Sequence, residues 1–190
     1  IVGLDAGVRE LGHLSDGTVI PNPRALDRET VRLRRSRLAI ARKQRAADKR
    51  LGKRAKGQRR TDSSRLRRER HVAARLQRRV ADLRKDALHK ATTWIAKTYA
   101  TVVVEDLRSR NMTRRCRGKG RSAKAGLNRS ILDSGMLRLR SLLTYKMPLR
   151  GGLLLVVPAA YTSQACSRCG PKILNDPGSY KTYKCATCGL

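Results

Sequence analysis

Four cysteines near the C-terminus form the most specific chemical pattern in the sequence. Cys166 and Cys169 make one C-x2-C pair, and Cys185 and Cys188 make a second pair after a spacer of fifteen residues. Four thiolates at this spacing suit tetrahedral Zn²⁺. Because sulfur fills every ligand position, no place is left for a water nucleophile, and we predict a structural zinc ion. The fifth cysteine, Cys116, stands alone in a basic segment and is interpreted as a spectator thiol.

Two carboxylates follow the most strand-like runs of the chain. Asp5 comes directly after the run Ile-Val-Gly-Leu, and Glu105 comes directly after Thr-Val-Val-Val. Carboxylates on neighbouring strands offer the oxygen ligands that Mg²⁺ or Mn²⁺ prefers. Two such ions can activate a water and stabilise the leaving oxygen in phosphodiester cleavage. The simpler interpretation is that each carboxylate caps the turn after it, and the residues alone leave both interpretations open.

The charge balance predicts a polyanionic partner. Lys and Arg number 45 against 14 Asp and Glu, which gives a formal net charge of +31 and an isoelectric point near 11.5. Repulsion of this size destabilises a compact chain unless a polyanion neutralises it, and nucleic acid is the obvious polyanion. Aromatic residues make up only 3% of the chain, so contact with phosphates is favoured over base stacking.

The positive charge is concentrated in two segments. Residues 32–84 carry 22 Lys and Arg but only four acids, and residues 107–129 carry no acid. A solvated face of long helices is the alternative to phosphate contact, but so large an imbalance of sign favours contact. The residues that we single out as nucleic-acid contacts are Arg59, Arg60, Arg67, Arg68, Arg78, Arg79, Arg114, Arg115, Arg117, Lys119 and Arg121.

Hydrophobic periodicity places these residues on an α/β framework. Strands are predicted at the N-terminus and at residues 11–14, 19–20, 101–104 and 153–157. Residues 25–98 predict two long helices joined near 51–62, with an apolar stripe through Leu76, Val80 and Leu83. A loop is expected over 107–129 and a helix over 128–149. The longest near-apolar run, residues 153–160, is too short to span a bilayer, and we expect a cytoplasmic protein.

The order of these features resembles TnpB, the family of transposon-encoded, RNA-guided endonucleases related to type V CRISPR effectors. The runs Ile1-Val-Gly-Leu-Asp5-Ala-Gly-Val and Leu14-Ser-Asp-Gly-Thr-Val-Ile-Pro-Asn-Pro23 are similar to the start of its RuvC-like nuclease domain. Val103-Val-Glu105-Asp-Leu107 is similar to its second nuclease motif, and Leu132-Asp-Ser-Gly135 to the helix after that motif. Tyr161-Thr-Ser-Gln-Ala-Cys166-Ser-Arg-Cys169-Gly and Tyr183-Lys-Cys185-Ala-Thr-Cys188-Gly resemble the entry and exit of its zinc-binding insertion.

This resemblance implies a fold, a site and partners. It implies an RNase H-like (RuvC-like) α/β core over residues 1–160, with a long basic helical insertion at 25–98, and a four-cysteine zinc ribbon over 161–190. It implies Asp5 and Glu105 as catalytic ligands of Mg²⁺ or Mn²⁺, and a guide RNA and a target DNA as partners at the prokaryotic nucleoid. The family's third catalytic Asp follows the zinc insertion and is not among these 190 residues, so we expect a part of a larger protein.

Three functions remain as hypotheses. The first is the nuclease domain of an RNA-guided DNA endonuclease, which hydrolyses phosphodiesters with divalent metal. The second is a nuclease-inactive nucleic-acid-binding protein, either decayed or repurposed, and the missing third carboxylate keeps it open. The third is a basic zinc-ribbon protein associated with RNA. The two carboxylates at strand ends favour the first hypothesis over the third.

Overall fold

The computed structural model describes residues 1–52, 61–118, 120–159, 169–170 and 187–188. Within these residues a single five-stranded mixed sheet has the order β3-β2-β1-β4-β5. The pairs β1·β2 and β2·β3 are antiparallel, whereas β1·β4 and β4·β5 are parallel. The strands are β1 (Val2–Asp5), β2 (Gly12–Leu14), β3 (Val19–Ile20), β4 (Thr101–Glu105) and β5 (Leu153–Val157). The predicted α/β class and all five predicted strands are confirmed, with boundaries that differ by one residue or less.

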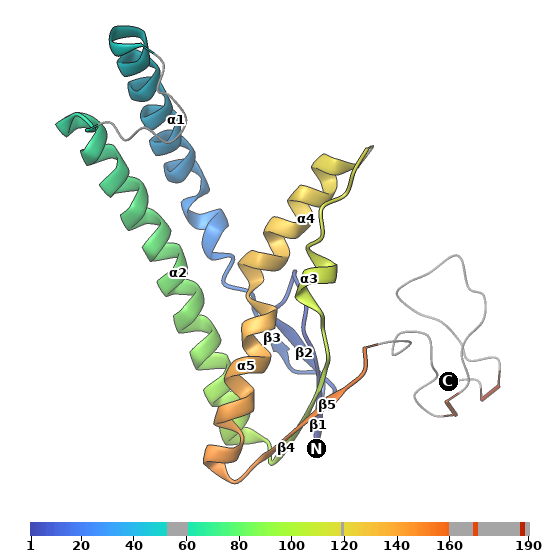
Figure 1. The fold of residues 1–190 in the computed structure, drawn as a ribbon. Coiled ribbons are helices and arrows are strands. Elements are labelled where there is room, and N and C mark those ends of the chain that lie inside the picture. The colour runs from blue at the N-terminus through green and yellow to red at the C-terminus, as the bar shows by residue number, and fades with distance from the viewer. Residues whose placement is uncertain (53–60, 119, 160–168, 171–186, 189–190) are drawn as a thin grey trace.

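Two long helices project from the sheet as a hairpin (Figure 1). They are α1 (Ala25–Leu51) and α2 (Ser64–Thr98), as the sequence predicted. Helix α1 ends at Gly52, whose φ of 78° places it in the left-handed region that favours glycine. Helix α2 begins after Ser63, whose side chain accepts a hydrogen bond from the backbone N–H of Leu66. The remaining helices are α3 (Ser109–Met112), α4 (Arg121–Ser134), α5 (Met136–Lys146) and the short 3-10 helix η1 (Pro148–Arg150).

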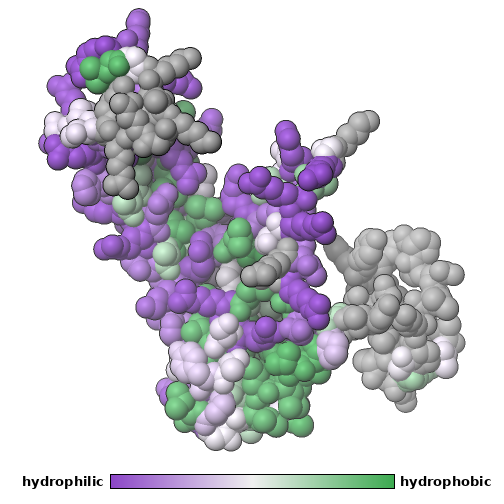
Figure 2. Space-filling view, in the orientation of Figure 1, coloured by the Kyte–Doolittle hydropathy of each residue, from purple (hydrophilic) through white to green (hydrophobic). Residues whose placement is uncertain are grey.

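The main core lies between one face of the sheet and the helices α2 and α5. Strand side chains such as Val102 pack there against Ile95 of α2 and Leu143 of α5, all fully buried. In β4 burial alternates residue by residue, as expected for a strand with one covered face. The other face has exposed apolar side chains at β5, and Figure 2 shows an apolar surface there. No helix in the described part of the chain covers this second face (Figure 1), which we call the uncovered face of the sheet.

A smaller core joins the two helices of the hairpin. Ala25, Leu33 and Val80 are buried there, and the predicted stripe residues Leu76 and Leu83 pack against them. Glu29 is buried at the same seam, and its carboxylate forms an ion pair with Arg79, with 3.1 Å between Oε1 and Nε. A buried and paired carboxylate in a mostly apolar seam favours one register between the helices.

The predicted loop over residues 107–129 and helix over 128–149 were wrong in their boundaries. Helix α4 begins at Arg121, because its run of Ala, Lys and Leu favours helix more strongly than Gly126 opposes it. Gly135, with φ of 68°, ends α4 and starts α5, so the expected single helix is broken in two. The second helix ends at Lys146, and Pro148 begins η1 rather than continuing it.

Most of residues 161–190 lie outside the described residues, so the predicted zinc ribbon has no structural account. Among the helices that the structure describes, none is both long and apolar enough to cross a membrane.

Candidate metal site and nucleic-acid surface

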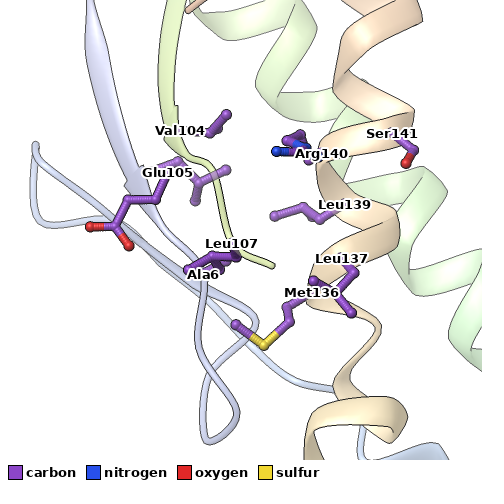
Figure 3. Close-up of a pocket in the computed structure, with 10 residues that line it drawn as sticks. Ala6, Val104, Glu105, Leu107, Met136, Leu137, Leu139, Arg140 and Ser141 are labelled. Carbon is purple, nitrogen blue, oxygen red and sulfur yellow. The ribbon is translucent and has the colours of Figure 1, made fainter. Parts of the chain in front are cut away.

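The two predicted catalytic carboxylates come from neighbouring parallel strands. Leu4 of β1 lies opposite Val104 of β4, so the next residues, Asp5 and Glu105, are neighbours at the carboxyl ends of these strands. Because Leu4 and Val104 point into the core, strand alternation directs the two carboxylates to the uncovered face of the sheet. Figure 3 shows the Glu105 carboxylate pointing away from the helix that carries Leu139. The structure therefore brings Asp5 and Glu105 together on one face.

The electrostatics of Asp5 reflect this placement. The pKa of Asp5 is raised from its ordinary value, first because protein atoms remove part of its solvent and second because the negative charge of Glu105 is close. The positive charge of His13 acts in the opposite direction and lowers the pKa. A carboxylate whose proton affinity is raised by a neighbouring negative charge lies where a cation is stabilised.

His13 is the one residue of this group that the sequence analysis missed. It lies on β2 directly opposite Asp5 in the antiparallel pairing, and it is exposed on the same uncovered face. In the sequence it is one of three scattered histidines without a recognisable partner. The available signal was the hairpin formed by residues 12–20, whose alternation buries Leu14 and leaves His13 facing outward.

The residues present fit a divalent cation in type but make an incomplete ligand set. Asp5 and Glu105 supply carboxylate oxygens, which are the ligands that Mg²⁺ and Mn²⁺ prefer. Among the described residues, no group of three or more His, Cys, Asp or Glu side chains is placed to hold a metal ion. Asp106, the next carboxylate in sequence, instead forms an ion pair with Arg140 of α5.

A pocket of about 240 Å³ lies between the ends of β1 and β4 and helix α5 (Figure 3). Its lining combines apolar side chains with Glu105 and Arg140. The backbone N–H of Asp106 donates to Val157 of β5 at 2.8 Å, and the Asp106 side chain pairs with Arg140. These contacts fix the chain immediately after Glu105.

The hairpin of α1 and α2 carries most of the positive charge that the structure describes. The two helices contain 21 Lys and Arg against six Asp and Glu. Figure 2 shows a hydrophilic surface along the hairpin. The predicted contacts Arg67, Arg68 and Arg78 are exposed, whereas Arg79 is already paired with the buried Glu29. The predicted contacts that lie outside the described residues are Arg59, Arg60 and Lys119.

A second basic surface lies at the start of α4. Exposed arginines surround a hollow of about 820 Å³ that also includes Cys116. The preceding segment is held to α4 because the Lys124 amine donates to the carbonyl of Met112 and the Asn128 amide donates to that of Thr113. The predicted contacts in this hollow are Arg114, Arg115, Arg117 and Arg121.

The zinc ligands are only partly described. Cys169 and Cys188 belong to the described residues, whereas Cys166 and Cys185 lie outside them. The four-cysteine site therefore stays a prediction from the sequence.

Comparison with known proteins places the chain among transposon proteins. Residues 1–115 match the OrfB_IS605 family, described as a probable transposase, and residues 137–190 match the Cas12f1-like TNB domain. An Escherichia coli (strain K12) protein named "Putative RNA-guided DNA endonuclease InsQ" is 37% identical over 191 residues, covering 97% of this chain and 44% of that protein. A Streptomyces pristinaespiralis protein named "Putative RNA-guided DNA endonuclease" is 33% identical over 189 residues, covering 99% of this chain and 40% of its own length.

Proposed function

Because the chain belongs to the OrfB_IS605 transposase family, the TnpB proteins, and carries a TNB domain, we propose that it acts as the nuclease part of an RNA-guided DNA endonuclease. In this proposal Asp5 and Glu105 hold the divalent ions used for phosphodiester hydrolysis. The chain spans about two fifths of the length of the curated relatives that it matches. Guide binding, target recognition and cleavage are therefore proposed for the whole protein to which this chain contributes.

The parallel pairing of β1 with β4 is the observation that carries the proposal. It places two of the chain's 14 acidic side chains next to each other on the uncovered face, within a protein whose charge is otherwise strongly positive. The raised pKa of Asp5, caused in part by Glu105, supports the same site. The strand order β3-β2-β1-β4-β5, with β2 antiparallel to its neighbours, supports an RNase H-like core.

Each group of residues has a separate task in this proposal. Asp5 and Glu105 provide carboxylate oxygens to the divalent ions, which when bound supply an activated water and stabilise the leaving oxygen. Helix α5 and β5 hold the chain after Glu105 through the contacts of Asp106 described above. The basic hairpin and the arginines at the start of α4 contact the phosphates of guide RNA and target DNA, while base pairing supplies sequence recognition.

We propose that residues 161–190 form the zinc-binding module and that residues 1–160 form the core that carries it. A TNB domain implies zinc binding, and the match to residues 137–190 contains all four predicted cysteine ligands. A closed four-thiolate site would act by folding this module, because about thirty residues bury too little apolar surface to be stable without metal.

A nuclease-inactive nucleic-acid binder is the second candidate. It is favoured by one observation, which is that no third metal-ligating side chain joins Asp5 and Glu105 among the described residues. In that case the phosphate contacts remain and only the metal-dependent step is lost. The two candidates therefore differ in cleavage and agree in binding.

The test uses the chain extended by a segment that supplies the third catalytic Asp expected from the family resemblance. Asp5→Asn and Glu105→Gln keep the shape of each side chain and remove its charge, so each should abolish Mg²⁺-dependent and Mn²⁺-dependent cleavage of guide-matched DNA. Binding of guide RNA should be nearly unchanged, because phosphate affinity comes from Lys and Arg. Asp16→Asn, at an exposed carboxylate in a turn of the same sheet, is the matched control and should cleave normally. Full cleavage by Asp5→Asn would contradict the proposed site.

A further inference from the structure

A second pocket, of about 250 Å³, lies where the start of α1, the loop after β1 and helix α4 meet. Three arginines from these three elements line it, namely Arg9, Arg24 and Arg129. None of them belongs to the basic surfaces described above. The loop that contributes Arg9 begins directly after Asp5, so the pocket flanks the same edge of the sheet as the two carboxylates.

The pocket is held by hydrogen bonds between its three elements. The Asn22 amide donates to the carbonyl of Val8 at 2.6 Å, and its oxygen accepts from the backbone N–H of Arg24 at 3.0 Å. Asp133 of α4, one turn after Arg129, accepts from the backbone N–H of Leu26 at 3.1 Å. Two buried or half-buried polar side chains therefore fix the spacing of the backbones that carry the arginines.

The three guanidinium groups have no ion-pair partner within the part of the chain that the structure describes. Asp133 also lines the pocket, but its carboxylate forms an ion pair with Arg84 at 2.5 Å and accepts the hydrogen bond from the Leu26 N–H. Asp27 is the other acid in the lining, and it forms no ion pair with these arginines among the described residues. The lining thus holds three arginines and two acids, one of which is already paired with Arg84, so it keeps a net positive charge that favours a phosphate group.

Arg24, the residue before α1, has a left-handed backbone held by a hydrogen bond from its N–H to the Asn22 side chain. Arg24 has φ of 45° and is the one non-glycine residue with positive φ among the described residues. An arginine in the left-handed region costs free energy that a glycine would avoid, and such strain is commonly found at binding sites. Its side chain is exposed and makes no ion pair with any residue that the structure describes, so the guanidinium is available to a ligand.

We infer that this pocket binds a backbone phosphate of a single DNA strand and delivers that strand to the edge of the sheet that carries Asp5 and Glu105. The pocket is smaller than sites for drug-sized ligands, so it suits one phosphodiester group rather than a whole nucleotide or a base pair. Arginine is suited to this task because its planar guanidinium contacts two phosphate oxygens at once. The inference rests on the proposed function for the identity of the strand, whereas phosphate binding rests on the pocket alone.

The test measures binding of a fluorescent 20-nucleotide single-stranded DNA to the chain at several salt concentrations. The variants are Arg9→Ala, Arg24→Gly and Arg129→Ala. The matched control is Arg150→Ala, which removes an equally exposed arginine from η1, before β5 and at the opposite edge of the sheet. Each pocket variant should weaken binding by roughly fivefold to tenfold and lower the slope of log affinity against log salt by about 0.7. The control should change the affinity less than about twofold.

Arg24→Gly separates binding from folding. Because glycine relieves the left-handed strain, this variant should unfold at the same temperature as the parent chain or higher, while its DNA affinity falls. Pocket variants that bind single-stranded DNA as the control does, with an unchanged salt slope, would overturn the inference. A loss of affinity confined to duplex DNA or to RNA would also overturn it. If Asp5→Asn left cleavage intact while the pocket variants lost binding, the proposed nuclease site would fail and the phosphate pocket would stand.

Discussion

Replacing Asp5 by asparagine should stabilise the metal-free protein. Neighbouring parallel strands lie about 4.8 Å apart, so the side chains of Asp5 and Glu105 leave the backbone at roughly that separation, which we take for their charges. At this distance the repulsion is about 1 kcal/mol in a water-like dielectric, and physiological salt lowers it to about 0.5 kcal/mol. Protein atoms remove part of the solvent around Asp5, but its side chain remains exposed, so we use the water-like value. We expect Asp5→Asn to raise the free energy of unfolding by about 0.5–1 kcal/mol at pH 7.5 without added divalent metal.

The raised pKa of Asp5 also makes the stability of the folded protein depend on pH. The folded-state pKa of Asp5 is raised above the ordinary value of 3.8, so the folded protein binds the proton more tightly than the unfolded chain. Stability therefore falls as the pH rises from about 4 through the raised pKa, and stays constant above it. The advantage of Asp5→Asn should be present at pH 7.5 and should disappear below pH 4, where the parent carboxyl is protonated and uncharged.

Urea unfolding at pH 3.5 and pH 7.5, followed by circular dichroism, measures both effects. In the double variant Asp5→Asn/Glu105→Gln, the second substitution should change the free energy of unfolding little at pH 7.5, because the first already removes the repulsion. Asp16→Asn is a control that should change the free energy of unfolding in the opposite direction. The pKa of Asp16 is lowered by the hydrogen bond from the Tyr99 hydroxyl, so removing its charge should destabilise the protein at neutral pH and matter less in acid. Equal or lower stability of Asp5→Asn at pH 7.5 would refute the reasoning.

Three further predictions concern other parts of the chain. Asp133→Ala should lower the free energy of unfolding in urea by about 2–3 kcal/mol, because it removes the acceptor for the Leu26 N–H at the start of α1 and leaves the half-buried Arg84 without its partner. A decrease below about 0.5 kcal/mol would contradict this. Affinity for duplex DNA or RNA should fall steeply between 50 and 200 mM salt, and a nearly constant affinity would exclude phosphate contact as its source. Elemental analysis should find about one zinc per chain, and a folded zinc-free module with four reactive thiols would contradict the ligand set Cys166, Cys169, Cys185 and Cys188.

Local patterns predicted the elements of this fold well, because their signals are confined to a few residues. The β-branched run ending at Val104 specified a strand, and the spacing of Leu76, Val80 and Leu83 specified one face of a long helix. The break at Gly135 was missed, because a left-handed residue between two helices depends on tertiary contacts. A Cβ there would lie 2.9 Å from Leu88 of α2, which no local pattern reveals.

The candidate site was predictable only in part. Acidic residues at strand ends suggested Asp5 and Glu105, but which strands are neighbours came from the resemblance to a known family, since strand order is a long-range property. The place of His13 depended on the antiparallel register of β2, which a shift of one residue would reverse. The contact of Asp133 with the start of α1 joins residues 107 positions apart, and sequence spacing carries no signal for it.

Asp5 and Glu105 together should hold divalent metal. The most direct measurement is a crystal structure of the parent chain soaked in millimolar Mn²⁺, with anomalous data collected to locate the ion. We expect an anomalous peak between the two carboxylates, which Asp5→Asn abolishes while the strands keep their pairing. A fully ordered β1–β4 edge with no peak there, or a peak that persists in Asp5→Asn, would contradict it.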